Sequence, residues 1–293
     1  MDLEPGDKIP GPIALERVIY RRKSGVIWLA THADRGLVSV KVPSAAALHE
    51  DEELAERFRL ESRATVEINS EHVVHVLEDG LIDGAVPFVV MEALEGEPLR
   101  ARLEREGTLS LEDADRVVEQ AAAGLSAAHA VGIVHRDINP ETIFLHKPAD
   151  GRLTVKVVDF GVAKIIGGRL VDPHLTRHGR LVGTPAYVSP ERASAKKPTP
   201  DADMWSLAVV AYEILVGKRP FEAKTLGVQL VKIIQGDYEP VSELRSELGR
   251  EMDDFFEKAF AQEVSMRFHT MRDMATAFTV ALAGTDDALD WSL

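Results

Sequence analysis

The sequence predicts an α+β, bilobal fold in which a β-rich N-terminal lobe with one main helix precedes a mostly helical C-terminal lobe. The length of 293 residues suggests two domains or one large two-lobed domain, at about 150 residues per domain. Short runs rich in β-branched residues fill the first ninety residues, and helical periodicity dominates after Gly96. We expect the lobes over residues 13–94 and 95–284, and an acidic tail over 285–293.

Short strands and turns alternate in the N-terminal lobe. The strand-like runs are Ile13–Ile19, Val26–Thr31, Leu37–Val42, Val73–Leu77 and Phe88–Met91. Gly and Asp predict turns between or beside these strands, at residues 23–25, 34–36, 78–80 and 83–84. One helical segment, about 45–67, interrupts them.

Amphipathic and apolar helices dominate the C-terminal lobe. Residues 111–130 have a helical period and follow Ser110, a residue type suited to the N-cap. Residues 204–216 are almost all apolar, which predicts a helix buried on all sides that ends at Gly217. Further helical patterns occupy 225–235, 251–262 and 271–283. The long irregular stretch 161–200 is typical of a functional segment.

Composition excludes several classes of protein. The chain has no cysteine, which excludes disulfides, thiolate catalysis and iron–sulfur clusters. A net charge of −14 argues against a nucleic-acid partner, because phosphate-backbone binding needs clustered Lys and Arg. The acidic start does not resemble a signal peptide, and no apolar run is long enough for a membrane segment. We therefore expect a cytoplasmic protein.

An ordered series of short motifs runs through both lobes. The series is Lys41 at the end of a strand, Glu61 on the next helix, His135-Arg136-Asp137, Asp159-Phe160-Gly161, Gly183-Thr184-Pro185, Ser189-Pro190-Glu191 and Asp203 before the buried helix. Each motif alone is a weak signal, but the whole set in this order is specific. It resembles the eukaryotic-type Ser/Thr protein kinase catalytic domain, especially the bacterial branch, from about Ile13 to Gly284.

The resemblance implies transfer of the ATP γ-phosphoryl group to Ser or Thr of proteins, with Mg²⁺ or Mn²⁺ as cofactor. Lys41 would hold the α- and β-phosphates, and Glu61 would fix its ammonium group. Asp159 would hold the metal, because a hard cation prefers carboxylate oxygen. Asp137 would accept or orient the proton of the attacking hydroxyl. The implied partners are ATP and a protein substrate or regulatory protein.

The resemblance also implies a set of residues around the nucleotide. Besides Lys41, they are Ile19, Gly25, Ile27, Ser39, Met91 at the gatekeeper position, Glu92 and Leu94 at the hinge, and Phe144 beneath the base. Ser39 stands where the family usually has Ala. Glu191 and Arg267 resemble a structural ion pair of the family, and Asp203 resembles the residue that bonds the backbone near residues 135–137.

Two segments depart from the family pattern. Only Gly25 remains of the glycine-rich loop, and Arg21, Arg22 and Lys23 either neutralise phosphate by side-chain charge or are solvated turn residues. In the catalytic loop, Asn139 replaces the family's phosphate-neutralising Lys.

Thr142 replaces the Asn that binds a second Mg²⁺, although a Thr hydroxyl can also ligate Mg²⁺. Each loss of a charge-stabilising group typically lowers the rate ~10²- to 10³-fold. We therefore expect weak or lost activity, and the alternative is a pseudokinase that serves as a nucleotide-binding or partner-docking scaffold. Small-molecule phosphotransfer is disfavoured, because residues 183–191 match protein kinases.

Thr176 is the one hydroxyl-bearing residue between Gly161 and Gly183. A phosphothreonine adds about −1.5 to −2 charge and can order a segment through Arg pairs. Arg136 holds the family position that pairs with such a phosphate. The sequence therefore predicts Thr176 as an activation site, with an ordinary exposed loop threonine as the alternative.

Overall fold

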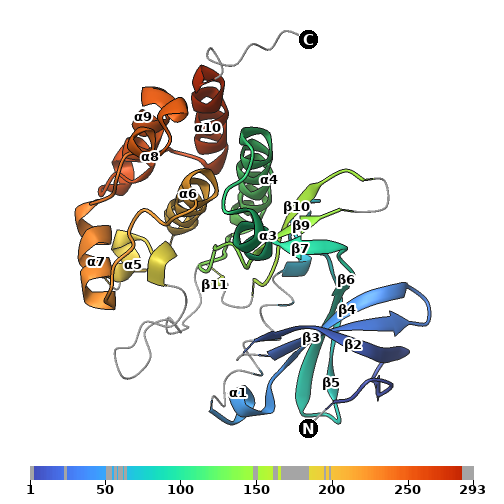
Figure 1. Cartoon of the computed structure of the whole chain (residues 1–293). Helices are drawn as coiled ribbons and strands as arrows, with labels where there is room; N and C mark the ends of the chain where they lie inside the picture. Colours follow the sequence, from blue (N-terminus) through green and yellow to red (C-terminus); the bar gives the residue numbers. More distant parts are fainter. Residues whose placement is uncertain are drawn as a thin grey trace. The chain divides into compact units, whose positions relative to one another are not determined.

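A computed structural model describes residues 3–22, 25–50, 55, 58, 62, 65–147, 151–160, 164–165, 185–194, 196–197 and 199–285. The chain divides into two units. The first comprises residues 1–69, 73–95 and 147–152, and the second comprises 70–72, 96–146 and 153–293. The described elements of the first unit are mostly strands and those of the second mostly helices (Figure 1).

A six-stranded antiparallel sheet of order β1-β2-β3-β4-β6-β5 forms the first unit. Its strands are β1 (Lys8–Ile9), β2 (Ile13–Arg22), β3 (Gly25–His32), β4 (Gly36–Pro43), β5 (Val76–Ile82) and β6 (Val86–Glu92). Four of the five predicted strands are confirmed with differences of up to three residues at their ends, whereas the predicted strand Val73–Leu77 overlaps β5 only at its last two residues. The prediction of a sheet-rich N-terminal lobe is therefore correct.

The turn predicted at residues 78–80 is wrong. These residues lie inside β5, and Gly80 pairs with Phe88 of β6. A Cβ atom at Gly80 would lie 2.6 Å from two atoms of the Phe88 ring, so the glycine makes room for that ring. The reversal occurs at Asp83 and Gly84, which have φ of 50° and 71°. Glycine marks a close approach at the first position and a left-handed turn at the second.

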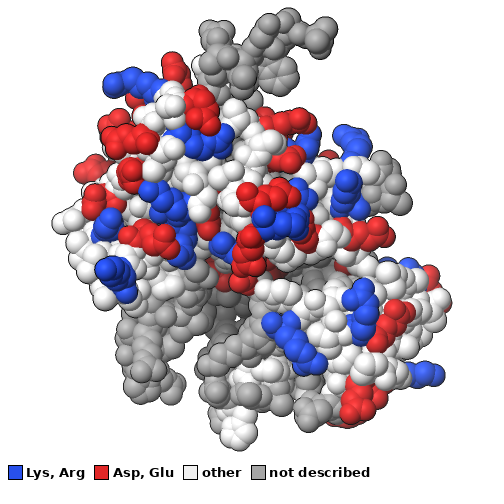
Figure 2. All heavy atoms as spheres, viewed as in Figure 1, with Lys and Arg blue, Asp and Glu red and all other residues white. Residues whose placement is uncertain are grey.

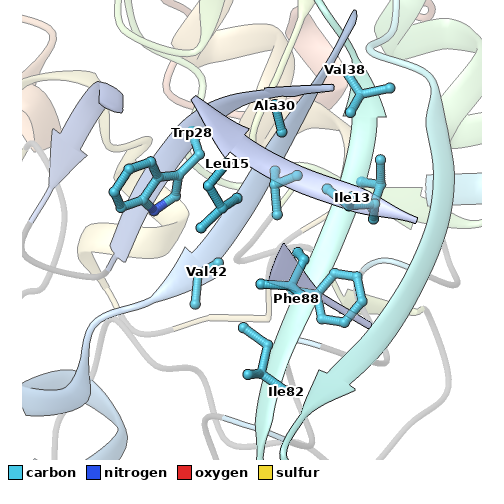
Figure 3. Packing of buried hydrophobic residues seen from close by; sticks show 11 residues of the cluster. Ile13, Leu15, Trp28, Ala30, Val38, Val42, Ile82 and Phe88 are labelled. Atoms are coloured by element: carbon cyan, nitrogen blue, oxygen red, sulfur yellow. The ribbon is translucent and has the colours of Figure 1, made fainter. Parts of the chain in front are cut away.

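Inward-facing side chains of the sheet form the core of the first unit. Trp28, Val40 and Phe88 are buried there with eight further apolar residues (Figure 3). After β4 the chain enters α1 (Ala45–Glu50), where the Ser44 hydroxyl accepts a hydrogen bond from the Ala47 amide (3.1 Å). This helix confirms the start of the predicted segment 45–67, and most of residues 51–64 lie outside the described part.

The second unit contains helices and short two- and three-stranded sheets. The helices are α3 (Leu99–Glu106), α4 (Leu111–Ala130), α5 (Pro190–Ala193), α6 (Pro200–Val216), α7 (Leu226–Gln235), α8 (Val241–Leu244), α9 (Gly249–Ala259) and α10 (Met271–Thr285). The strands are β7 (Gly96–Pro98), β8 (Ile133–Val134), β9 (Ile143–His146), β10 (Thr154–Val157) and β11 (Lys164–Ile165), in the orders β10-β9-β7 and β11-β8. Short 3₁₀ turns include η1 (Pro185–Tyr187).

The long helices begin and end where their capping residues predict. Ser110 accepts from the Asp113 amide at the start of α4, and Gly217 adopts a left-handed conformation (φ 76°) at the end of α6. The α6 helix is buried on all sides, as its apolar sequence predicts, and it begins four residues earlier than expected. Pro200 suits the first turn because its missing N–H has no partner to lose there.

On the face shown in Figure 2, acidic and basic side chains are interspersed. Glu97, in β7 just before α3, contacts two basic side chains: its carboxylate accepts from Arg105 (2.6 Å) and Arg102 (2.7 Å). Mainly through the Arg105 hydrogen bond, these contacts lower the pKa of Glu97 to about 2 against the effect of burial.

Among the described residues, no helix is long and apolar enough to cross a membrane.

Candidate active site

The segment that carries Asp137 is held by a buried carboxylate on another helix. Asp203 of α6 accepts hydrogen bonds from the amides of His135 (2.8 Å) and Arg136 (2.7 Å), and His129 Nε2 donates to it (2.8 Å). Burial raises the pKa of Asp203, but its contacts with His129, His135 and the Arg136 amide together lower it below its ordinary value. The predicted structural role of Asp203 is therefore confirmed.

Arg136 lies in the left-handed region with φ of 72°, and Asp159 has φ of 64°. Non-glycine residues rarely adopt this conformation, so the surrounding contacts must hold it. At Arg136, those contacts include the Asp203 carboxylate on its amide and the guanidinium of Arg192, which donates to its carbonyl. The backbone next to Asp137, at Arg136, and the backbone at Asp159 are thus both held in a strained conformation.

Asn139 and Thr142, the two positions where the sequence predicts a departure from the family pattern, bond to the loop that carries Asp137. The fully buried Thr142 hydroxyl donates to the Asp137 carbonyl (2.9 Å) and accepts from the Asn139 amide (3.1 Å). The Asn139 side chain donates to the same Asp137 carbonyl (2.9 Å) and accepts from the Glu141 amide (2.9 Å). Both side chains therefore stabilise the backbone turn that presents Asp137.

The segment with Asp159 adjoins this loop. The Val158 amide donates to the Thr142 carbonyl (2.9 Å), and His135 Nε2 donates to the Val158 carbonyl (3.0 Å). The rings of His135 and Phe160 meet edge to face at 4.6 Å. Asp137 and Asp159, far apart in sequence, thus lie on backbone segments that are hydrogen-bonded to each other within the second unit. Phe144 lies on β9, which begins just after the loop.

In the first unit, neighbouring strands carry several of the predicted nucleotide residues. Ile27 pairs with Lys41, and Ser39 pairs with Met91. The Lys41 ammonium lies 5.4 Å from the centre of the Phe58 ring, within the range of a cation–π contact.

The Ser39 hydroxyl donates to the Glu92 carbonyl (2.9 Å), a bond that the family's Ala cannot make. The Glu92 carboxylate accepts from the His75 amide (2.8 Å). Both contacts hold the end of β6, after which Leu94 lies half-buried.

β2 and β3 pair as an antiparallel hairpin at the position where the sequence predicts a degraded glycine-rich loop. Arg22 of β2 pairs with Gly25 of β3, and the residues between them, Lys23 and Ser24, lie outside the described part. A Cβ atom on Gly25 would lie 2.5 Å from the Val42 carbonyl oxygen, so the close approach of β4 requires glycine here. Packing alone therefore explains why this glycine is present. Ile19, on the same hairpin, is 40% exposed.

Several predicted residues lie outside the described part of the structure. They are Glu61, Gly161, Thr176, Gly183 and Thr184, together with the tail beyond residue 285. Their roles stay predictions, as do the catalytic and nucleotide-binding roles assigned above.

The predicted ion pair between Glu191 and Arg267 is confirmed. Arg267 is fully buried and donates to both Glu191 carboxylate oxygens, at 2.9 and 3.1 Å. Burial raises the pKa of Glu191, but the hydrogen bond and charge of Arg267, together with hydrogen bonds from the Glu191 backbone and Ser189, lower it below its ordinary value. The guanidinium also lies over the Trp205 ring, 4.9 Å from its centre.

Sequence reasoning missed two arginines near the loop, Arg100 and Arg192. Arg100 of α3 bonds to the loop and to Tyr187, and Arg192 bonds to the Arg136 carbonyl. In the sequence, Arg100 is one of three arginines in a charged helix, and nothing local separates it from Arg102 and Arg105. Only the tertiary contacts distinguish it.

The donor set fits a Mg²⁺ ion held together with substrate phosphates. Mg²⁺ usually takes one or two protein carboxylates and completes its shell with water and phosphate oxygen. Asp159 offers such a carboxylate, whereas the Thr142 hydroxyl is already bonded within the loop. Among the described residues, no group of three or more His, Asp or Glu lies close enough together to hold a metal ion by itself.

Comparison with known proteins identifies relatives along nearly the whole chain. Serine/threonine-protein kinase PknA of Mycobacterium tuberculosis is 33% identical over 287 residues, which cover 95% of this chain and 63% of PknA. Serine/threonine-protein kinase PkaB of Streptomyces coelicolor is 34% identical over 276 residues, covering 91% and 64%. The chain thus spans a little under two thirds of the length of these relatives.

A solved structure shows the same fold. The kinase domain of Mycobacterium tuberculosis PknI matches with a TM-score of 0.73 and 22% identity, covering 96% of this chain and all of that one. The predicted two-part fold, β-rich and then helical, is therefore confirmed. The protein kinase domain family itself matches residues 17–278. The chain belongs to the protein kinase domain family.

Proposed function

We propose that this chain transfers the γ-phosphoryl group of ATP to serine or threonine hydroxyls of proteins. The observation that carries the proposal is its similarity to proteins named serine/threonine-protein kinases over more than nine tenths of its length. Lys41, Asp137 and Asp159, the residues that the chemistry needs, are all present in family order. We place this activity in the cytoplasm, where ATP is available.

In this proposal Asp137 orients the attacking hydroxyl of the protein substrate and accepts its proton. Two hydrogen bonds to the Asp137 carbonyl, from Asn139 and Thr142, support a fixed backbone at this residue. Such positioning supplies most of the catalysis in phosphoryl transfer, because the protein does little covalent chemistry there.

Lys41 and Asp159 handle the phosphates. The Lys41 ammonium binds the α- and β-phosphate oxygens, with Glu61 as its carboxylate partner. Asp159 holds Mg²⁺ or Mn²⁺, and this metal neutralises charge on the phosphates. Thr142 is the proposed second metal ligand, and its hydroxyl must then exchange its bond to the Asp137 carbonyl for the metal.

The base of ATP lies against apolar side chains in this proposal. Ile19, Gly25, Ile27, Met91 and Phe144 provide the contact surface, while Glu92 and Leu94 offer backbone groups to the base edge. Ser39 supports the proposal indirectly, because its bond to the Glu92 carbonyl orients that group.

The test is direct. We expect the purified chain, incubated with γ-labelled ATP, Mg²⁺ or Mn²⁺ and dephosphorylated casein, to label casein or itself. Asp137→Asn and Lys41→Met should remove the label, since each deletes a group that acts on the transferring phosphoryl. Mass spectrometry should place self-label on Thr176, where Arg136 is the proposed phosphate partner. Label that persists in Asp137→Asn would contradict the proposed role of that residue.

A second function, a nucleotide-binding or partner-docking scaffold, is favoured by one observation. The side chains of Asn139 and Thr142 are committed to the loop backbone, where the family places a phosphate-neutralising Lys and a metal-binding Asn. A melting temperature that rises with ATP, in the absence of any label, would select this alternative.

Restoring the family residues tests whether these two positions limit the rate. We expect Asn139→Lys combined with Thr142→Asn to raise turnover ~10²-fold, because each restored group stabilises charge in the transition state. Asn69→Lys, which adds the same charge at an exposed site, is the matched control and should leave turnover unchanged. Unchanged turnover in a folded double variant would show that these residues are not limiting.

A further inference from the structure

Three residues from separate elements of the second unit form a partly buried polar cluster. The Arg100 guanidinium of α3 donates to the Tyr187 hydroxyl (2.6 Å) and to Glu213 Oε1 of α6 (3.0 Å). The Tyr187 hydroxyl in turn donates to Glu213 Oε2. Tyr187 is 3% exposed and the Glu213 side chain 8%, so water screens the bond between them little, whereas the Arg100 side chain is 28% exposed. Each member thus satisfies polar groups of the other two.

The chemistry of the cluster favours one rigid arrangement. Bonds between an ionised and a buried polar group are stronger and more directional than neutral ones, and a closed network leaves no alternative partner. Burial, and then the Glu213 charge, raise the pKa of Tyr187 far above its ordinary value, so its hydroxyl stays a donor. Replacing any member leaves the others with unmet bonds.

Arg100 also contacts the catalytic loop. Its backbone N–H donates to the Pro140 carbonyl (2.8 Å), three residues after Asp137. At the other end of the cluster, the Ser206 hydroxyl donates to the Tyr187 carbonyl (2.7 Å), which fixes the backbone of the 3₁₀ turn η1. One residue therefore holds the Asp137 loop with its backbone and η1 with its side chain. A shift of Arg100 would move both segments.

We propose that Arg100 is a positioning residue that couples the loop carrying Asp137 to the segment 185–189, and thereby sets where a protein substrate's hydroxyl meets Asp137. The inference rests on the proposed function for its kinetic consequence. The structural coupling itself depends only on contacts within the second unit. Small displacements matter here, because a misplacement of about 1 Å can lower a rate ~10²-fold.

Kinetics provide the first test. Tyr187→Phe keeps the ring and removes only the hydroxyl, and Arg100→Gln keeps most of the side-chain length and removes the charge. With casein as substrate, we expect both variants to raise the KM for casein ~10-fold, the effect of losing one charge-assisted hydrogen bond. The KM for ATP should stay within about twofold, because neither residue is among the proposed nucleotide contacts. Arg100→Lys should recover part of the loss.

Hydrogen exchange of the nucleotide-free chain provides a test that needs no activity. In Arg100→Gln and in Tyr187→Phe, amides of both 137–142 and 185–192 should exchange ~10-fold faster than in the wild type. The matched control is Arg105→Gln on the same helix, whose guanidinium bonds to the carboxylates of Glu97 and Glu106 instead. It should leave both segments unchanged.

The outcomes separate the two proposals. Suppose that the wild type labels casein. The positioning role is then overturned if the variants change the KM for ATP as much as the KM for casein, or if they change neither KM. If the wild type transfers no phosphate, the proposed function fails and hydrogen exchange decides alone. Faster exchange in both segments supports the coupling, and a change confined to residues next to the substitution overturns it.

Discussion

Replacing Asp203 by alanine is expected to lower the free energy of unfolding by ~3–5 kcal/mol, the range for removing one partner of a buried charged network. The carboxylate is fully buried and accepts three hydrogen bonds, two of them from the amides of His135 and Arg136. Alanine leaves both amides without these partners in a site that has no replacement acceptor of the same reach. Urea unfolding at neutral pH measures the loss.

The same substitution should also remove phosphoryl transfer, for a separate reason. The Arg136 backbone is held at φ of 72°, a conformation that costs of order 1–3 kcal/mol of strain energy. Without Asp203 that strain is released by a backbone change next to Asp137. The measurement is the labelled-ATP assay at a temperature where circular dichroism shows the variant folded.

A matched control is available on the same helix. Asp201 also lies in the first turn of α6, but its carboxylate accepts an exposed hydrogen bond from the Thr199 hydroxyl (2.8 Å). Asp201→Asn should change stability by no more than about 0.5 kcal/mol. Equal effects of Asp203→Ala and Asp201→Asn would mean that the buried network does not hold the loop.

Replacing Arg267 by alanine is expected to lower stability by a similar ~3–5 kcal/mol, because it leaves the Glu191 carboxylate buried without its cation. The guanidinium bonds both carboxylate oxygens and also donates from Nε to the Ala261 carbonyl (2.8 Å). Arg267→Lys should recover little, since an ammonium group cannot reproduce the two-pronged geometry. Urea unfolding of the three proteins gives the comparison.

A double variant shows whether the loss comes from the unpaired charge. Arg267→Met with Glu191→Gln removes both charges and should be more stable than Arg267→Ala by ~1–4 kcal/mol. If the double variant is as unstable as Arg267→Ala, the cavity and the lost Ala261 contact explain the effect instead.

We also expect the stability contributed by the Glu191–Arg267 pair to depend on pH. Because the pKa of Glu191 is lowered in the folded state, its contribution to stability is present above the ordinary carboxyl value of 4.5 and is lost as the pH falls below it. Asp203, whose pKa is also lowered, acts in the same direction. The double variant should therefore lose less stability between pH 7 and pH 4 than the wild type does.

Local sequence patterns predicted most elements correctly. The helix α4 begins after Ser110 and α6 ends at Gly217, because capping is decided by the few residues around each end. The prediction failed at Gly80, which lies in a strand. A glycine required by a neighbouring ring looks the same in sequence as a glycine required by a turn.

The candidate site also has features that the sequence predicts and features that it does not predict. The motifs containing Asp137 and Asp159 are contiguous in sequence and could be recognised there. The bonds by which Asn139 and Thr142 support the Asp137 carbonyl could not, because they depend on how the loop folds back on itself. Nor could the role of Arg100, whose partners lie 87 and 113 positions away.

The sequence by itself determined the family, the order of the elements and the residue types that phosphoryl transfer requires, since these depend on short motifs and on local periodicity. The tertiary structure added the further residues that hold the loop: Arg192 with its guanidinium and Arg100 with its backbone N–H. The physical reason is that a hydrogen bond needs two groups within about 3 Å. Groups far apart in sequence reach that separation only once the helices have packed.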